Sequence, residues 1–111
     1  MLGSQHLPDF NGSILVLEDI NEVPYKIDRM LTQLKLAEIP QVCNAIVMGN
    51  FNSCGETNEL HRVFADFAKD IEAPVISGLP FGHCLPRLNL PVGAHVELEF
   101  KSTATLKIIR Y

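Results

Sequence analysis

Glu18 is the first side chain placed where acid–base chemistry could be done. It directly follows the apolar run at residues 13–17, whose β-branched composition is typical of a strand buried on both faces. Open α/β sheets bind ligands outside the carboxyl ends of their strands, which makes Glu18 a candidate site residue. A surface carboxylate that marks where the strand leaves the core explains the same pattern equally well.

His83 is the second candidate, and it lies near the centre of a Gly/Pro-rich loop over residues 78–86. Gly78 and Gly82 allow the backbone to bend, while Pro80 stiffens part of the loop. An imidazole with a pKa of about 6.5 suits a general acid or base. A loop histidine bonded to a backbone carbonyl is the alternative, and the pattern does not separate the two.

Other groups of residues are weaker candidates for a functional site. A metal site built from His61, His83, Cys54 and Cys84 has no close ligand spacing except the adjacent pair 83–84, and no CxxC or HxxxH supports it. A Cys84 nucleophile activated by His83 is disfavoured because side chains of neighbouring residues point apart. Arg29 fits an ordinary ion pair with Glu22 or Asp19, or a contact with a substrate carboxylate. No metal and no cofactor is therefore predicted.

The chain also lacks the parts of a complete hydrolase site. There is no GxSxG motif and no P-loop, and none of the five serines lies at a strand-to-helix elbow. A complete hydrolase site therefore cannot be assembled from this chain alone.

The elements that must position Glu18 and His83 follow from the periodicity. Short apolar strands are expected at residues 13–17, 45–48 and 74–77, the second ending at Gly49. Two amphipathic helices lie between them. Alternation over residues 96–100 and 105–109 predicts an antiparallel hairpin with a turn near Ser102. The fold class is therefore α/β, a mixed sheet with two helices and a C-terminal β-hairpin.

Each predicted helix has an apolar face and a cap. Asn21 is the expected cap of the first helix, and a capping box at 53–56 or Thr57 that of the second. The apolar positions are spaced three and four residues apart, at Ile27, Met30, Leu31 and Leu34 in the first helix and at Leu60, Val63, Phe64, Phe67 and Ile71 in the second.

Length and composition limit the possible classes of protein. The 111 residues suffice for one domain, with residues 1–12 as a linker or arm and 13–111 as the folded part. A net charge of −4 argues against nucleic acid or an anionic membrane as partner. Three cysteines, an odd number, read as reduced thiols rather than a disulfide framework. Neither a membrane span nor a signal peptide is apparent, so a cytoplasmic location is expected.

Five ordered blocks of the sequence resemble the C-terminal domain of the LD-carboxypeptidases, which include muramoyltetrapeptide carboxypeptidase and the microcin-immunity peptidases. The blocks are residues 13–20, 25–34, 46–54, 74–83 and 88–93. The resemblance implies a swivelling β/β/α domain and a Ser-His-Glu triad divided between two domains. Glu18 and His83, 65 residues apart, match the glutamate and the histidine of that triad.

The resemblance also implies a substrate and a missing partner. Members of the family hydrolyse the LD-peptide bond of murein tetrapeptide and release the terminal D-alanine, and some relatives cleave peptide–nucleotide antibiotics instead. The serine and the oxyanion hole would come from an N-terminal domain, so this chain is expected to be inactive alone.

Two alternatives to a half-enzyme stay open. One is a non-catalytic interaction module that forms homodimers through an exposed apolar surface. The other is a metal-binding regulatory domain that uses His83 and Cys84. The candidate residues for the dimer surface are Leu2, Leu7, Phe10, Phe81 and Leu85.

Overall fold

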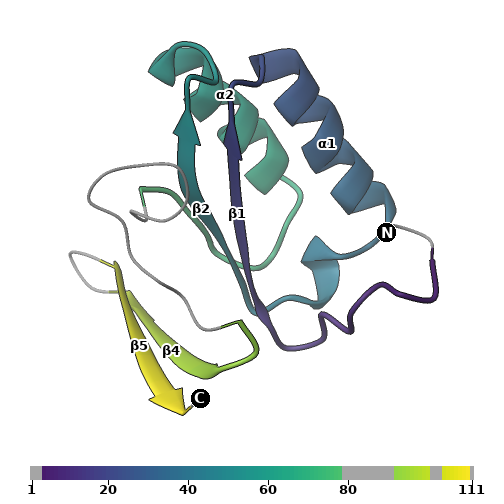
Figure 1. Cartoon of the computed structure of the whole chain (residues 1–111), viewed down its shortest axis with the longest axis vertical. Coiled ribbons are helices and arrows are strands. Elements are labelled where there is room, and N and C mark those ends of the chain that lie inside the picture. Colours follow the sequence, from purple (N-terminus) through teal and green to yellow (C-terminus); the bar gives the residue numbers. More distant parts are fainter. Residues whose placement is uncertain (1–3, 79–91, 101–103, 111) are drawn as a thin grey trace.

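The computed structural model describes residues 4–78, 92–100 and 104–110 (Figure 1). In chain order the elements are β1 (Ile14–Ile20), α1 (Pro24–Leu36), the short 3-10 helix η1 (Pro40–Val42), β2 (Ala45–Asn52), α2 (Thr57–Ala68), β3 (Val75–Ile76), β4 (His95–Phe100) and β5 (Ala104–Arg110). This order, with two helices between three strands and then a hairpin, confirms the predicted α/β class.

The first three strands form a parallel sheet in the order β1-β2-β3. Each connection contains a helix, as parallel neighbours require. Because the order never reverses and such crossovers are right-handed, α1 and α2 lie on the same face of the sheet. Figure 1 shows the two helices side by side beside β1 and β2.

The core lies between this helical layer and the sheet. Ile46 and Met48 of β2 are fully buried, and Ile27 of α1 is 1% exposed. Leu15 and Leu17 of β1 pack against the same cluster. Because side chains alternate along a strand, the intervening residues of β1, Glu18 among them, point to the sheet's other face.

The last two strands, β4 and β5, form a separate antiparallel sheet. Its register shifts between His95 and Val96. In Figure 1 this hairpin lies beside the amino end of β1, away from the helices. The turn predicted near Ser102 falls outside the described residues.

Two predicted strand ends were wrong. β1 continues through Glu18 and Asp19 to Ile20, and β2 continues through Gly49 to Asn52. The two strands pair with each other as far as Ile20 and Asn52, so ladder hydrogen bonds extend each strand beyond its apolar run.

Both predicted helix caps were wrong as well. The residue that precedes α1 is Val23 and the residue that precedes α2 is Glu56, and neither makes a side-chain capping bond. Asn21 and Ser53 instead adopt left-handed conformations, with φ of 56° and 55°. In that conformation each residue forms the turn at the end of a strand and does not cap the following helix.

Three predictions of burial also need correction. Met30 belongs to the predicted apolar face of α1 but is 41% exposed. Leu7 and Phe10 were expected on an exposed dimer surface, yet both pack against the core. Their apolar area is thus used within the domain, and the other residues proposed for that surface lie outside the described part. The homodimer itself stays a prediction.

Candidate functional site

Glu18 lies in the carboxyl half of β1 and is half-buried. It belongs to the face of the sheet that the helices leave uncovered, because its neighbour Leu17 packs into the helical core. The backbone partner strand is β2, the central strand of the sheet. A carboxylate is therefore held on a rigid element, near the edge where open α/β sheets bind ligands.

A β-bulge lies directly opposite Glu18. Leu17 pairs with Met48 and Asp19 pairs with Phe51, so two residues of β2, Gly49 and Asn50, face the single residue Glu18. Such bulges occur beside active sites and redirect side chains. The sequence contained no signal for this bulge beyond Gly49, which we interpreted as the end of the strand.

The bulge encloses one polar atom without a partner. The side-chain oxygen of Asn50 is buried and accepts no hydrogen bond from the part of the chain that the structure describes. An unsatisfied buried acceptor costs about 1–3 kcal/mol, and such groups call for an explanation. Sequence reasoning missed this residue because an asparagine late in a strand carries no distinctive motif.

Left-handed residues follow each of the three parallel strands. Asn21 comes directly after β1, Ser53 directly after β2, and Gly78 two residues after β3, with φ between 55° and 92°. Glycine adopts such a φ without strain, but at Asn21 and Ser53 the conformation is strained, and strain of this kind is concentrated at functional sites. Here it turns the chain sharply at the carboxyl edge of the sheet, where Glu18 lies.

Two of the loops at this edge are in contact. Gly55, with φ of 98°, follows β2, and a Cβ added to it would lie 2.7 Å from Cγ of Pro24 at the start of α1. The loop after β2 therefore packs tightly against the start of α1, where the loop after β1 ends.

His83 lies outside the described residues, so its distance from Glu18 stays a prediction. The described chain leaves β3 at Ile76 and reaches Gly78, five residues before His83. Because β3 is parallel to β1, this departure is at the same carboxyl edge as Glu18.

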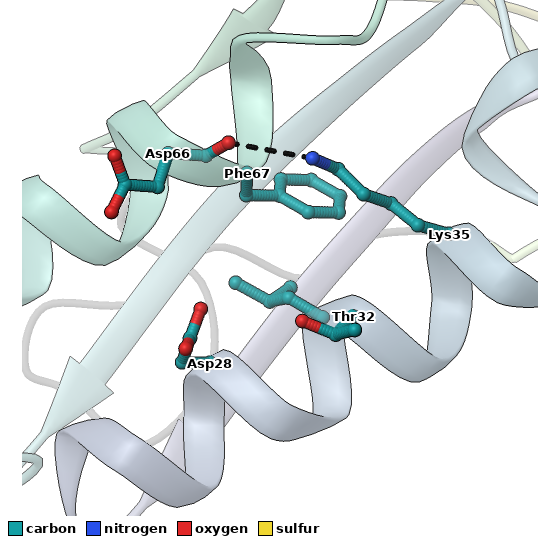
Figure 2. Close-up of a pocket in the computed structure, with 6 residues that line it drawn as sticks. Asp28, Thr32, Lys35, Asp66 and Phe67 are labelled. Carbon is teal, nitrogen blue, oxygen red and sulfur yellow. Dashed lines mark hydrogen bonds between the residues drawn. The ribbon is translucent and has the colours of Figure 1, made fainter.

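A different pocket lies between the two helices (Figure 2). The helices cover the face of the sheet opposite to the one that carries Glu18. The pocket has a volume of about 160 Å³ and is lined by Asp28, Leu31, Thr32, Lys35, Asp66 and Phe67. The ammonium of Lys35 donates to the backbone oxygen of Asp66 at 3.3 Å and lies 5.4 Å from the centre of the Phe67 ring. Lys35 thus links α1 to α2.

A wider cleft lies at the opposite, amino end of the parallel strands. It has a volume of about 900 Å³ and opens between the first half of β1 and β4. Its lining is mostly apolar and includes Ile14, Val16, Val96 and Leu98. His95 and Glu97 of β4 also line it, whereas Glu18 does not.

The remaining sequence candidates are not brought together. Cys43 and Cys54 are buried and form no disulfide among the described residues, whereas His61 is exposed on α2. Among the residues that the structure describes, no three His, Cys, Asp or Glu side chains gather around one point. Glu22 pairs with Lys26, at 3.7 Å, rather than with Arg29. None of the described helices is long and apolar enough to cross a membrane.

Comparison with known proteins identifies the family of this chain. Residues 1–98 match the family model described as the LD-carboxypeptidase C-terminal domain. The murein tetrapeptide carboxypeptidase of Pseudomonas aeruginosa is 38% identical over 101 residues, which cover 88% of this chain and 32% of that protein.

Solved structures agree with the sequence comparison. The muramoyltetrapeptide carboxypeptidase of Oxalobacter formigenes superposes with a TM-score of 0.87 at 34% identity, over 97% of this chain and 40% of that one. The microcin C7 self immunity protein has a TM-score of 0.83 at 25% identity, over 98% of this chain and 34% of that one. The chain spans about a third of the length of the curated relatives that it matches. It belongs to the LD-carboxypeptidase family and corresponds to the C-terminal domain of those proteins.

Proposed function

We propose that this chain supplies the glutamate and the histidine of a Ser-His-Glu triad in a serine-type LD-carboxypeptidase. Glu18 and His83 are the two residues. The substrate is a murein tetrapeptide, from which hydrolysis of the LD-peptide bond releases the terminal D-alanine. The relatives from Pseudomonas and Oxalobacter carry names with this activity, and the chain matches them over nearly its whole length.

The observation that carries the proposal is the placement of Glu18 and of the exit from β3 at one edge of the sheet. β1 and β3 are separated only by β2, so their axes lie about 10 Å apart. Five residues of extended chain span up to about 17 Å, which is enough for His83 to reach Glu18 from Gly78. The face that carries Glu18 is the one that α1 and α2 leave uncovered.

The two residues would have distinct roles. His83 takes the proton of the attacking serine as general base and returns it to the leaving amine as general acid. Glu18 accepts a hydrogen bond from the other ring nitrogen, fixes the tautomer and stabilises the imidazolium as it forms. The serine and the oxyanion hole come from an N-terminal domain, so we expect the chain alone to release no D-alanine.

A chimera tests this assignment. The chain replaces the C-terminal domain of the Pseudomonas aeruginosa enzyme, and release of D-alanine from murein tetrapeptide is measured. Glu18→Gln should lower kcat by about 10⁴-fold through loss of the tautomer, and His83→Ala by about 10⁶-fold through loss of the general base.

Asp19→Asn is the matched control for the glutamate. Asp19 is adjacent in β1 but points to the opposite face, and its Oδ1, which an asparagine keeps, accepts a hydrogen bond from the Ile20 backbone at 2.8 Å. Its kcat should stay near that of the parent chimera. If the His83→Ala chimera retained full turnover, the triad assignment would be wrong.

A further inference from the structure

The unsatisfied side-chain oxygen of Asn50 is the starting point of a further inference. It is enclosed in the bulge that faces Glu18, and it has no hydrogen-bond donor among the described residues. The atom has almost no accessible surface, so a neighbouring side chain of the domain is the first candidate for a partner of this amide.

The bulge directs Asn50 toward the face of the sheet that carries Glu18. Met48 belongs to the buried helical core and Phe51 packs against it, through a ring contact with Phe64 at 5.0 Å. The two residues between them, Gly49 and Asn50, therefore both occupy positions that point to the other face of the sheet. Glu18 is the residue of β1 directly opposite, one strand spacing of about 4.8 Å away.

The chemistry of an amide explains the enclosed oxygen. Rotation by 180° about the Cβ–Cγ bond exchanges the oxygen with the nitrogen at almost no change of shape, because the two ends of the group are nearly the same size. In that orientation two N–H donors occupy the enclosed position. A carboxylate has about four lone-pair positions, more than one imidazole can fill, so Glu18 can accept a hydrogen bond from the amide and another from a histidine.

We propose that Asn50 is a positioning residue that donates a side-chain N–H to the carboxylate of Glu18 and holds that carboxylate in the orientation required by its partner. The inference rests on the proposed function for its catalytic consequence, but the contact itself does not. Asn50 acts through Glu18 and touches neither substrate nor the reacting atoms. It accounts for a bulge at this point of β2 and for an asparagine whose amide is buried there.

The contact is tested by NMR on the 111-residue chain itself. The side-chain NH₂ resonances of Asn50 should shift with pH in step with the carboxyl carbon of Glu18, and Glu18→Gln should abolish that titration. The side-chain amide of Asn44 is the internal control, because Asn44 is exposed and precedes the opposite end of β2. The proposal would be overturned if the side-chain resonances of Asn50 were the same in Glu18→Gln as in the parent chain at every pH. The pH dependence of the parent chain is measured without any substitution, so poor folding of a variant does not affect that part of the test.

The catalytic consequence is tested in the Pseudomonas chimera. Asn50→Ala should lower kcat by about tenfold to a hundredfold with KM near the parent value, because only the orientation of a catalytic group is lost. Asn44→Ala should leave both constants unchanged. A kcat for Asn50→Ala within twofold of the parent would overturn the positioning role. Glu18→Gln is assayed alongside: full activity there refutes the triad, whereas loss there with a fully active Asn50→Ala refutes only this inference.

Discussion

Gly55→Ala probes the contact that joins the loops after β1 and β2. The new methyl group would lie 2.7 Å from Cγ and 2.9 Å from Cδ of Pro24, whereas carbon atoms in contact normally lie about 3.5–4.0 Å apart. The proline ring or the loop must move by about 0.8 Å, and overpacking of this kind costs about 1–3 kcal/mol. The φ of 98° adds about 1–2 kcal/mol for any residue with a Cβ. We therefore expect the free energy of unfolding to fall by about 2–5 kcal/mol.

Gly78→Ala is the matched control for this substitution. Gly78 has nearly the same φ, 92°, but no described atom lies within 4 Å of the position of an added Cβ. It should show only the conformational cost, about 1–2 kcal/mol. Urea unfolding of the two variants measures the difference, with the slope m checked for constancy. Equal losses of stability in Gly55→Ala and Gly78→Ala would refute the claim that the contact with Pro24 matters. Partial recovery on adding Pro24→Ala to Gly55→Ala would support it.

Three further predictions concern the core, the helical layer and the N-terminal segment. Ile46→Ala removes a fully buried side chain and should lower the free energy of unfolding in urea by about 2–5 kcal/mol, whereas Val42→Ala, at a residue 39% exposed, should change it far less. Lys35→Met should cost less than about 1 kcal/mol, because the carboxylate 3.9 Å away is 80% exposed, and it should leave turnover of the chimera unchanged. The backbone N–H of Asn11, at 3.0 Å, and then its side-chain amide, at 2.6 Å, hold the pKa of Asp9 below its ordinary value. Since that pKa is depressed in the folded state, the stabilisation is present at neutral pH and is lost as the pH falls through the folded pKa. Asn11→Ala should raise the pKa of Asp9 toward its ordinary value in a carbon-13 NMR titration, and an unchanged value would contradict the assignment.

The elements of this fold were largely readable from periodicity. Runs of β-branched residues located all three parallel strands, and spacings of three and four residues located both helices. The boundaries were harder, because they depend on pairing between strands. Glu18 and Asp19 interrupt the apolar run of β1, yet the backbone of β2 continues to pair beyond them. Asn21 and Ser53 have the residue types of helix caps, but the geometry of the sheet edge requires left-handed turns at those positions.

The residues of the candidate site were also only partly predictable from the sequence. Local patterns, a carboxylate beside a buried strand and a histidine between glycines, made Glu18 and His83 candidates, and the resemblance to the family singled them out. Asn50 could not be singled out, because its significance depends on which residue of β1 it faces. That depends in turn on a shift of register between two strands far apart in the sequence.

The sequence by itself determined the order of elements, the apolar faces that build the core, and the family to which the chain belongs. The elements and their apolar faces are local properties, set by side-chain type and spacing, whereas the family follows from the resemblance of five ordered blocks of sequence. Only the tertiary structure decided where each strand ends, which face Glu18 occupies, and that a bulge places a buried amide opposite it. Those features arise from hydrogen bonds and packing between distant segments, and no local pattern of residues specifies them.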